Sequence, residues 1–329
     1  MRSVLLVKTS SMGDVIHNLP VVSDLRRIWP QATIDWVVEE SFAEIPRLHP
    51  EVHKVIPVAI RRWRKQLGQA ATWREMRSAS AVLRENYYDF IIDTQGLAKS
   101  ALISRVAQGL RCGYAREVAR EPLAALAYDC HYVIPRNAHA VERNRWLAAA
   151  ACEYAQDLPL RYGIHAPDAL PAWATAGLQD SPFAVLLTAT SRDDKLWPEA
   201  HWIALGHALR EQGLSCVLPA GNPAERTRAE RIAAAIPHAL VAPPSRLTEL
   251  ASLMQAAQAV VGVDTGLSHL AAALDRPIVA IAVSTDPALT GVHGGPRTMN
   301  LGGIGQIPEP AAVMHALAPH LAARARQQA

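Results

Sequence analysis

The stretch VVGVDTGLSHLAAALDRPIVAI, residues 260–281, decides the fold of this chain. It opens with a short apolar run typical of a buried strand and turns through Asp264, Thr265 and Gly266. An apolar helix and a second apolar run follow. A strand, a helix and a strand in this order form a parallel pair joined by a right-handed crossover. The stretch therefore predicts an α/β fold built on a parallel sheet.

The same alternation of apolar runs and amphipathic segments extends along the whole chain of 329 residues. We expect strands at residues 4–7, 34–38, 55–58, 90–93, 131–134, 184–188, 215–218, 260–263 and 278–282. We expect helices at residues 15–28, 73–84, 198–213, 224–236, 247–258 and 267–274.

The length suits two domains, and a cluster of prolines (Pro167, Pro171 and Pro182) marks their boundary. We place an N-terminal domain at residues 1–166 and a C-terminal domain at residues 167–329. Each is expected to be a Rossmann-like parallel sheet covered by helices, with the two domains facing each other across a cleft.

Positive charge is concentrated in the first half. The net charge is only +3, but the segment from Lys54 to Arg120 holds 13 Lys or Arg and 5 Asp or Glu. Such a basic face is expected to meet an anion. A nucleic-acid patch is possible but not expected, because no RNP motif, zinc finger or interleaved stacking aromatics accompany these charges. An acidic small molecule or a lipid headgroup fits as well.

The four cysteines share no CxxC spacing and no short metal-ligand pattern. We therefore expect buried thiols in a reducing compartment and no bound metal. The sequence shows no signal-peptide core and no apolar run near the ~18 to 20 residues of a membrane span. A cytoplasmic protein is expected, whose basic face could touch an anionic membrane surface.

The turn in VKTSSMGDVIHNLP, residues 7–20, joins the first expected strand to the first helix. In an open parallel sheet, ligands gather at such strand ends. Ser10, Ser11 and the N–H groups around Gly13 form a polar cradle, and Asp14 stands at the helix start. An Asp in this place is a favoured N-cap. It could equally take a proton from an attacking hydroxyl.

The turn at Asp264, Thr265 and Gly266 exposes N–H groups at the start of a helix, which suits a phosphate or diphosphate, and His269 lies in the first helical turn. Plain turn and cap chemistry is the alternative. An aspartic protease would need two such loops in β-rich lobes, and this chain has one.

Two further strand ends carry polar residues. In TATSRDDKLWPEAHW, residues 188–202, a leaving diphosphate could rest on Thr188, Ser191 and Lys195, although a solvated charge cluster has the same composition. In LPAGNPAERTRAE, Glu225 begins a helix and could accept the hydroxyls of a ribose. No GxGxxG follows a strand and no GxxxxGK[ST] occurs, which speaks against nicotinamide and P-loop chemistry.

Together these segments resemble the lipopolysaccharide heptosyltransferase I family, glycosyltransferases of the GT-B fold. The resemblance runs over most of the chain, through VKTSSMGDVIHNLP, VIPVAIRRWRK, DTQGLAKSAL, AREPLA, HAVER, TSRDDKLWPEAHW and VDTGLSHLAAALDRP. The segments IRRWRK and TSSMGDV favour heptosyltransferase I over heptosyltransferase II.

The resemblance implies transfer of L-glycero-D-manno-heptose from ADP-heptose to the Kdo sugar of Kdo-lipid A at the cytoplasmic face of the inner membrane. It implies inversion at the sugar, no cofactor and no metal. Alternatives are a related heptosyltransferase with another core acceptor, or a non-catalytic protein that binds anionic lipid.

The resemblance also implies roles for individual residues. Asp14 matches the catalytic base, and Lys195 and Thr188 match the residues that hold the diphosphate. Glu225 matches the adenosine contact. The donor loop is matched by Asp264, Thr265, Gly266 and His269, and the acceptor site by Arg61, Arg62, Arg64, Lys65 and Arg120.

Overall fold

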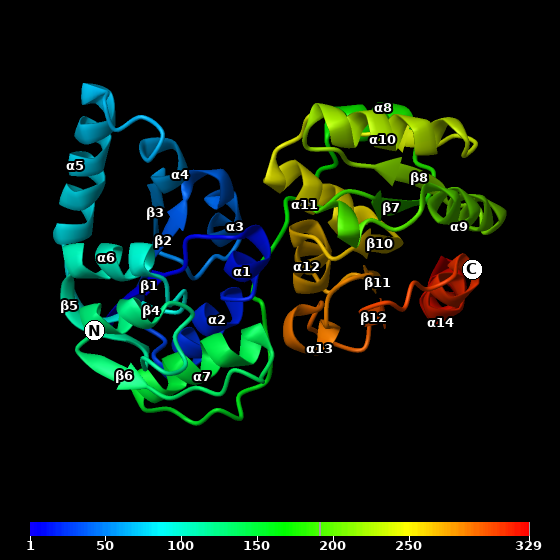
Figure 1. Cartoon of the computed structure of the whole chain (residues 1–329). Coiled ribbons are helices and arrows are strands. Elements are labelled where there is room, and N and C mark those ends of the chain that lie inside the picture. The colour runs from blue at the N-terminus through cyan, green and yellow to red at the C-terminus, as the bar shows by residue number, and fades with distance from the viewer. Residues whose placement is uncertain (191, 329) are drawn as a thin grey trace. The chain divides into compact units, whose positions relative to one another are not determined.

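The chain folds into two compact units, Met1–Ile164 and the residues from His165 onward, each described here by itself (Figure 1). The computed structural model describes residues 1–190 and 192–328. Both units are parallel sheets of six strands with helices packed on them. This is the layered α/β architecture that the sequence predicts.

The sheet of the first unit has the strand order β3-β2-β1-β4-β5-β6. Its strands are β1 (Ser3–Val7), β2 (Thr33–Glu39), β3 (Lys54–Val58), β4 (Tyr87–Asp93), β5 (Gln108–Tyr114) and β6 (Cys130–Tyr132). Its helices are α1 (Met12–Ile16), α2 (Leu19–Ile28), η1 (Glu40–Phe42), α3 (Glu44–Arg47), α4 (Ile60–Trp63), α5 (Ala70–Arg84), α6 (Ala98–Val106), η2 (Pro122–Ala127) and α7 (Ala140–Cys152).

The sheet of the second unit has the order β12-β11-β10-β7-β8-β9. Its strands are β7 (Phe183–Leu187), β8 (Ser215–Leu218), β9 (Leu240–Val241), β10 (Ala259–Val263), β11 (Ile278–Ala282) and β12 (Thr298–Gly302). Its helices are α8 (Ala172–Leu178), η3 (Asp193–Lys195), α9 (Glu199–Glu211), α10 (Pro223–Ala234), α11 (Leu247–Ala256), α12 (Gly266–Ala273), α13 (Pro287–Thr290) and α14 (Pro310–Gln328).

Both sheets contain a point where the winding reverses. In the first unit the chain builds outward from β1 to β3 and then returns to place β4 on the other side of β1. In the second unit it builds from β7 to β9 and returns to place β10 beside β7. Ligands of open α/β sheets bind at the carboxyl ends of the strands at such switch points. The fold therefore indicates one site region in each unit.

The cores follow from strand alternation, because successive residues of a strand face opposite sides of the sheet. In β1, Leu5 and Val7 join Leu83 of α5 in one buried cluster. In the second unit, Trp197 and Trp202 are fully buried and meet edge to face at 4.9 Å. Leu317 of α14 belongs to the same cluster, so the C-terminal helix packs in the second unit.

One helical expectation is wrong. The single helix expected over residues 15–28 is two helices, α1 and α2, separated at His17 and Asn18. Pro20 accounts for the break, because it lacks the N–H that would bond to the carbonyl of Ile16, four residues earlier, in a continuous helix. Because of the break, Asp14 lies in a short separate helix, α1.

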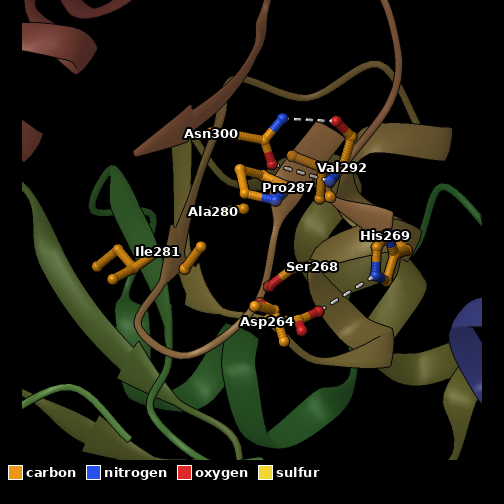
Figure 2. A pocket seen from close by; sticks show the side chains of 11 residues that line it. Asp264, Ser268, His269, Ala280, Ile281, Pro287, Val292 and Asn300 are labelled. Atoms are coloured by element: carbon orange, nitrogen blue, oxygen red, sulfur yellow. Dashed lines mark hydrogen bonds and ion pairs between the residues drawn. The ribbon is translucent and has the colours of Figure 1, made fainter. Parts of the chain in front are cut away.

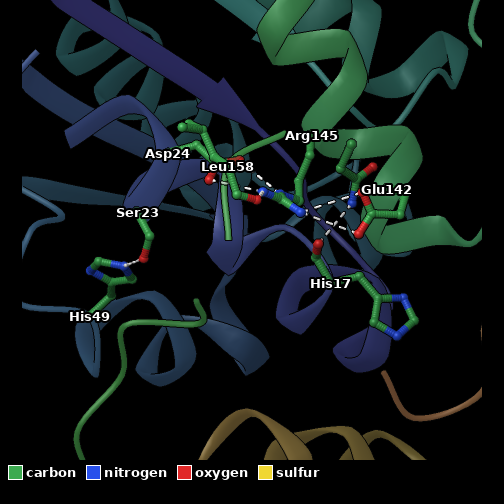
Figure 3. A network of polar contacts seen from close by, with 8 residues as sticks. His17, Ser23, Asp24, His49, Glu142, Arg145 and Leu158 are labelled. Carbon is green, nitrogen blue, oxygen red and sulfur yellow. Dashed lines mark hydrogen bonds and ion pairs between the residues drawn. The ribbon is translucent and has the colours of Figure 1, made fainter. Parts of the chain in front are cut away.

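A buried polar network ties the helices of the first unit together (Figure 3). The guanidinium of Arg145 in α7 donates to Asp24 of α2 at 2.8 Å, and both side chains are almost fully buried. The same guanidinium donates to Glu142 and to the carbonyl of Leu158. Each of these two buried charges is therefore compensated by an opposite charge within hydrogen-bond distance.

Replacing Arg145 by Leu is expected to destabilise the first unit by about 3 to 5 kcal/mol, because the Asp24 carboxylate would stay buried without its partner. Hydrogen exchange of the α2 and α7 amides in rising urea would measure the change. The matched control is Lys54→Met, which breaks an exposed ion pair to Glu85 and should cost less than about 1 kcal/mol. Equal effects of the two substitutions would contradict the assignment.

Candidate functional site

Asp14 lies in the first turn of α1, the helix that follows β1. Its Oδ2 accepts hydrogen bonds from the backbone N–H and the hydroxyl of Ser11, at 2.8 and 2.9 Å. Ser11 is the N-cap of α1, so Asp14 occupies the third helical position of a capping box. Asp14 therefore takes part in capping α1, as predicted, but the N-cap residue is Ser11. Because only one of its oxygens serves this role, the carboxylate can still act as a base.

A glutamine fixes the turn that carries Asp14. The Oε1 of Gln95, just beyond β4, accepts from the N–H groups of Thr9 and Ser10 at 2.7 and 3.1 Å, and its amide donates back to the Ser10 carbonyl. Asp93 in turn accepts from the Gln95 N–H at 2.9 Å. The turn after β1 is thus held by its neighbour across the switch point. Gln95 has no local signal in the sequence beyond its position in DTQGLAKSAL and was not predicted as a site residue.

A buried lysine lies close to Asp14. Lys8 donates to the carbonyl of Thr94 at 2.8 Å and to Asn144 at 3.3 Å. Burial alone would raise the pKa of the Asp14 carboxyl, but the charge of Lys8, the hydrogen bonds from Ser11 and the charge of Arg120 hold that pKa below its ordinary value. Asp14 is therefore an ionised carboxylate at neutral pH.

The expected acceptor cations differ in how far they are engaged. Arg62 pairs with Glu40 and Glu75 at 3.0 and 2.9 Å, so much of its charge is already compensated. The guanidinium of Arg61 lies over the Phe42 ring at 5.5 Å. Arg64 and Lys65 follow α4 as exposed side chains. Residues 60–65, which cover α4 and the two residues after it, are therefore strongly basic.

A second lysine extends the basic region to Asp14. Lys99 of α6 donates to the Ser10 hydroxyl at 3.0 Å. Burial lowers the pKa of Lys99, and the positive charges of Arg61 and Arg120 lower it further against the raising effect of Glu39 and Glu121. Cations that repel one another beside a carboxylate turn are suited to an anionic ligand. Lys99 was not predicted as a site residue either, although it lies in the segment DTQGLAKSAL.

The second unit brings together the residues expected to hold the donor. Lys195 of η3 donates to Oδ2 of Asp264 at 2.7 Å, and His269 of α12 approaches the other carboxylate oxygen at 3.7 Å. Burial would raise the pKa of Asp264, but His269 and Lys195 lower it well below its usual range. Segments that follow two neighbouring strands, β7 and β10, thus meet at the switch point.

Hydroxyl groups line the same strand ends. Thr190 donates its hydroxyl to the Asp264 carbonyl at 2.9 Å, which links the two segments a second time. Thr188 is fully buried, and its hydroxyl has no hydrogen-bond partner among the described residues. Thr265 is the N-cap of α12 and Gly266 its first residue. Ser191, also expected here, lies outside the described residues.

Glu225 begins α10 as expected, but its carboxylate is engaged locally. It accepts from the Gly221 N–H and from the side chain of Asn222, both at 2.7 Å. Asn222 is the N-cap of that helix. The side chain is half-buried, so a ribose hydroxyl could share its oxygens only alongside these bonds.

A small open pocket lies beside Asp264 and His269 (Figure 2). Asn300 of β12 shapes its far wall by a pair of hydrogen bonds with the backbone of Val292, at 2.8 and 2.9 Å. The remaining lining is mostly apolar, with Ser268 beneath the pocket. The carboxylate of Asp264 and the ring of His269 therefore border a small, mostly apolar recess of the second unit.

Two findings concern metals and membranes. No group of three or more His, Cys, Asp or Glu side chains in the described part of the chain is arranged to hold a metal ion. None of the helices described for this chain combines the length and the apolar character needed to cross a membrane.

Comparison with known proteins places these features in a family. Residues 76–316 match the model of glycosyltransferase family 9 (heptosyltransferase). Lipopolysaccharide heptosyltransferase 1 of Salmonella typhimurium is 46% identical over 88% of this chain and 91% of its own length.

Two solved structures extend the likeness to the fold. The E. coli heptosyltransferase WaaC with ADP superposes with a TM-score of 0.87 and 41% identity, over 97% of this chain and 99% of that one. WaaC with ADP-2-deoxy-2-fluoro heptose gives a TM-score of 0.82 at 41% identity, over 96% and 99% of the two chains. The chain belongs to glycosyltransferase family 9, the heptosyltransferases, and has the GT-B type of fold.

Proposed function

We propose that this chain transfers L-glycero-D-manno-heptose from ADP-heptose to the Kdo sugar of Kdo-lipid A, during assembly of the lipopolysaccharide inner core. The observation that carries the proposal is the ionised Asp14 carboxylate, fixed by Ser11 and surrounded by cations in the first unit. A base next to a basic surface suits an acidic sugar as acceptor. The heptosyltransferase 1 relative and the WaaC structures support the same donor and pathway.

The first unit is assigned to the acceptor. Kdo carries a carboxylate and lipid A carries phosphates, both of which suit arginine forks and lysines. Arg61, Arg64, Lys65 and Arg120 would bind these anions, with Lys99 as an addition, while Arg62 would orient its neighbours through Glu40 and Glu75. A peripheral position at the cytoplasmic face of the inner membrane would bring such an acceptor within reach.

The second unit is assigned to ADP-heptose. Lys195, His269 and the N–H groups at the start of α12 would face the diphosphate, and Thr188 would offer it a hydroxyl. Ser191, Thr265 and Gly266 would contribute polar contacts, and Glu225 would bind the ribose. Ser10 and Ser11 of the first unit are assigned to the donor as well. Asp264 would hold Lys195 in place through the 2.7 Å bond between them.

The proposed reaction is a single displacement with inversion. Asp14 takes the proton of the Kdo hydroxyl while that oxygen forms a bond to the anomeric carbon of the heptose. The bond from that carbon to the diphosphate oxygen breaks, and ADP leaves with the electron pair. Lys195 and the helix start stabilise the charge that grows on the β-phosphate. The charge is met by protein groups, so we propose that no metal takes part.

Asp14→Asn is expected to lower kcat about 10²- to 10⁴-fold, because a positioned base contributes roughly that much. Mass spectrometry of Kdo-lipid A incubated with ADP-heptose should show a gain of one heptose with the native chain and almost none with the variant. Asp157→Asn, an exposed carboxylate of the same unit, is the matched control and should not change the rate. A loss below about fivefold would reject Asp14 as the base.

Lys195→Met is expected to lower kcat about 10²- to 10³-fold, the usual effect of removing one group that stabilises developing charge. Steady-state kinetics with ADP-heptose would measure it, and Lys195→Arg should recover part of the rate by keeping the positive charge.

EDTA should leave the native activity unchanged. Loss of activity in EDTA that added Mg²⁺ restores would overturn the metal-free part of the mechanism.

Lys8→Met is expected to move the acidic limb of the kcat/KM profile to higher pH. The charge of Lys8 lowers the pKa of Asp14, so removing it raises that pKa, and the base becomes protonated at a less acidic pH. The profile of the native chain should stay flat down to the ordinary carboxyl range. Superimposable profiles would show that Lys8 does not tune the base.

A further inference from the structure

Three exposed leucines stand out on the first unit. Leu102 of α6 and Leu123 and Leu126 of η2 are 67%, 68% and 71% exposed. Single exposed leucines are common on soluble proteins, whereas several on one surface indicate an interaction site.

The three leucines belong to one surface, the leucine patch. Helices α6 and η2 pack together over buried Ala101, Ala124 and Tyr128. Residues three apart in a 3₁₀ helix lie on the same side, so Leu123 and Leu126 share a side of η2. Arg105, one turn after Leu102 on α6, donates to the Leu126 carbonyl at 3.3 Å. Leu102 and Arg105 are three residues apart and so share a side of α6, and this bond joins that side of α6 to the backbone of η2 at Leu126.

The leucine patch continues the basic region around Asp14. Lys99, which bonds to the Ser10 hydroxyl, is one turn before Leu102 on α6. Arg120, whose charge acts on Asp14, comes just before η2. Residues 98–126 contain five Lys or Arg and two Asp or Glu. Apolar side chains with a positive rim complement an anionic lipid surface.

The other basic segment of this unit repeats the arrangement. Just after Arg64 and Lys65, Leu67 and Trp73 are 50% and 47% exposed. The indole N–H of Trp73 donates to the Leu67 carbonyl at 2.8 Å, which holds the two residues together. Tryptophan favours the boundary between headgroups and acyl chains, because its ring is apolar and its N–H is polar.

We propose that the leucine patch, with Leu67 and Trp73 as a second contact, docks the first unit on a bilayer of anionic phospholipids. The proposal rests on the proposed function in one respect: a lipid acceptor gives the docking its purpose. Leu102, Leu123 and Leu126 enter the boundary between headgroups and acyl chains, and Lys99, Arg105 and Arg120 meet the phosphates. A lipid-linked sugar then reaches the Asp14 turn from the membrane side.

The test uses the full chain and vesicles of phosphatidylethanolamine and phosphatidylglycerol that contain no acceptor. Co-sedimentation should show binding of the native chain that weakens with salt and is much lower on phosphatidylcholine vesicles. The double variant Leu123→Ser, Leu126→Ser should bind about tenfold more weakly, because it loses two inserted apolar side chains. Leu102→Ser should show a smaller loss in the same direction.

The matched control is Ile304→Ser with Ile307→Ser, which removes two exposed apolar side chains, 74% and 49% exposed, from the second unit. It should bind vesicles as the native chain does. Native levels of binding by the leucine variant, or no binding of the native chain to anionic vesicles, would overturn the proposal. Loss of self-association in the leucine variant with unchanged vesicle binding would instead assign the patch to a second copy of this chain and overturn it as well.

A separate assay keeps this test independent of the proposed function. Heptose transfer to a water-soluble, acyl-free Kdo acceptor should be equal in the native chain and the leucine variant, because the patch does not touch the reacting groups. A native chain that binds vesicles but transfers no heptose would refute the function and leave the docking surface intact. A leucine variant that loses soluble turnover while vesicle binding is unchanged would overturn the docking proposal.

Discussion

The pairing of β1 with β4, and of β7 with β10, is the constraint on which the site residues depend. At each of these pairs the chain changes its direction of winding, so the two helices that follow the strands leave the sheet on opposite faces. The ends of the strands are then uncovered, and the turns that follow them can display side chains. Asp14 and Gln95 meet at one such pair, and Lys195 and Asp264 at the other.

The two units place a lysine and an aspartate differently, and the difference suits different chemistry. Lys195 and Asp264 bond directly at 2.7 Å, which fixes the ammonium in position but shares its charge. Lys8 is instead bound to Thr94 and Asn144, so it acts on Asp14 through its field alone. A direct ion pair at Asp14 would occupy the oxygen that has to accept a proton.

Much of this arrangement could be predicted from the sequence, because it is local. Every expected strand overlaps an observed one, and Asp14, Lys195 and Asp264 lie at strand ends where the pattern placed them. Strand β5, with the sequence QGLRCGY, was missed because two glycines and an arginine interrupt its apolar pattern. Gln95, Lys8 and Lys99 could not be assigned for another reason. Their roles depend on which strand pairs with β1, and strand order has no local signal.

The clamp between Gln95 and the Ser10 turn also has a consequence for how the chain acquires its site. The two residues are 85 positions apart in the sequence, and the hydrogen bonds between them require β4 to be seated beside β1. Contacts of such long range form late, because the loop they close must be ordered first. A growing chain that has completed β1, β2 and β3 already contains Asp14 and Ser11, but it lacks the Gln95 clamp that fixes the turn before them. The base is therefore assembled only when the central part of the first sheet is complete, so the site cannot be preorganised in a half-made protein.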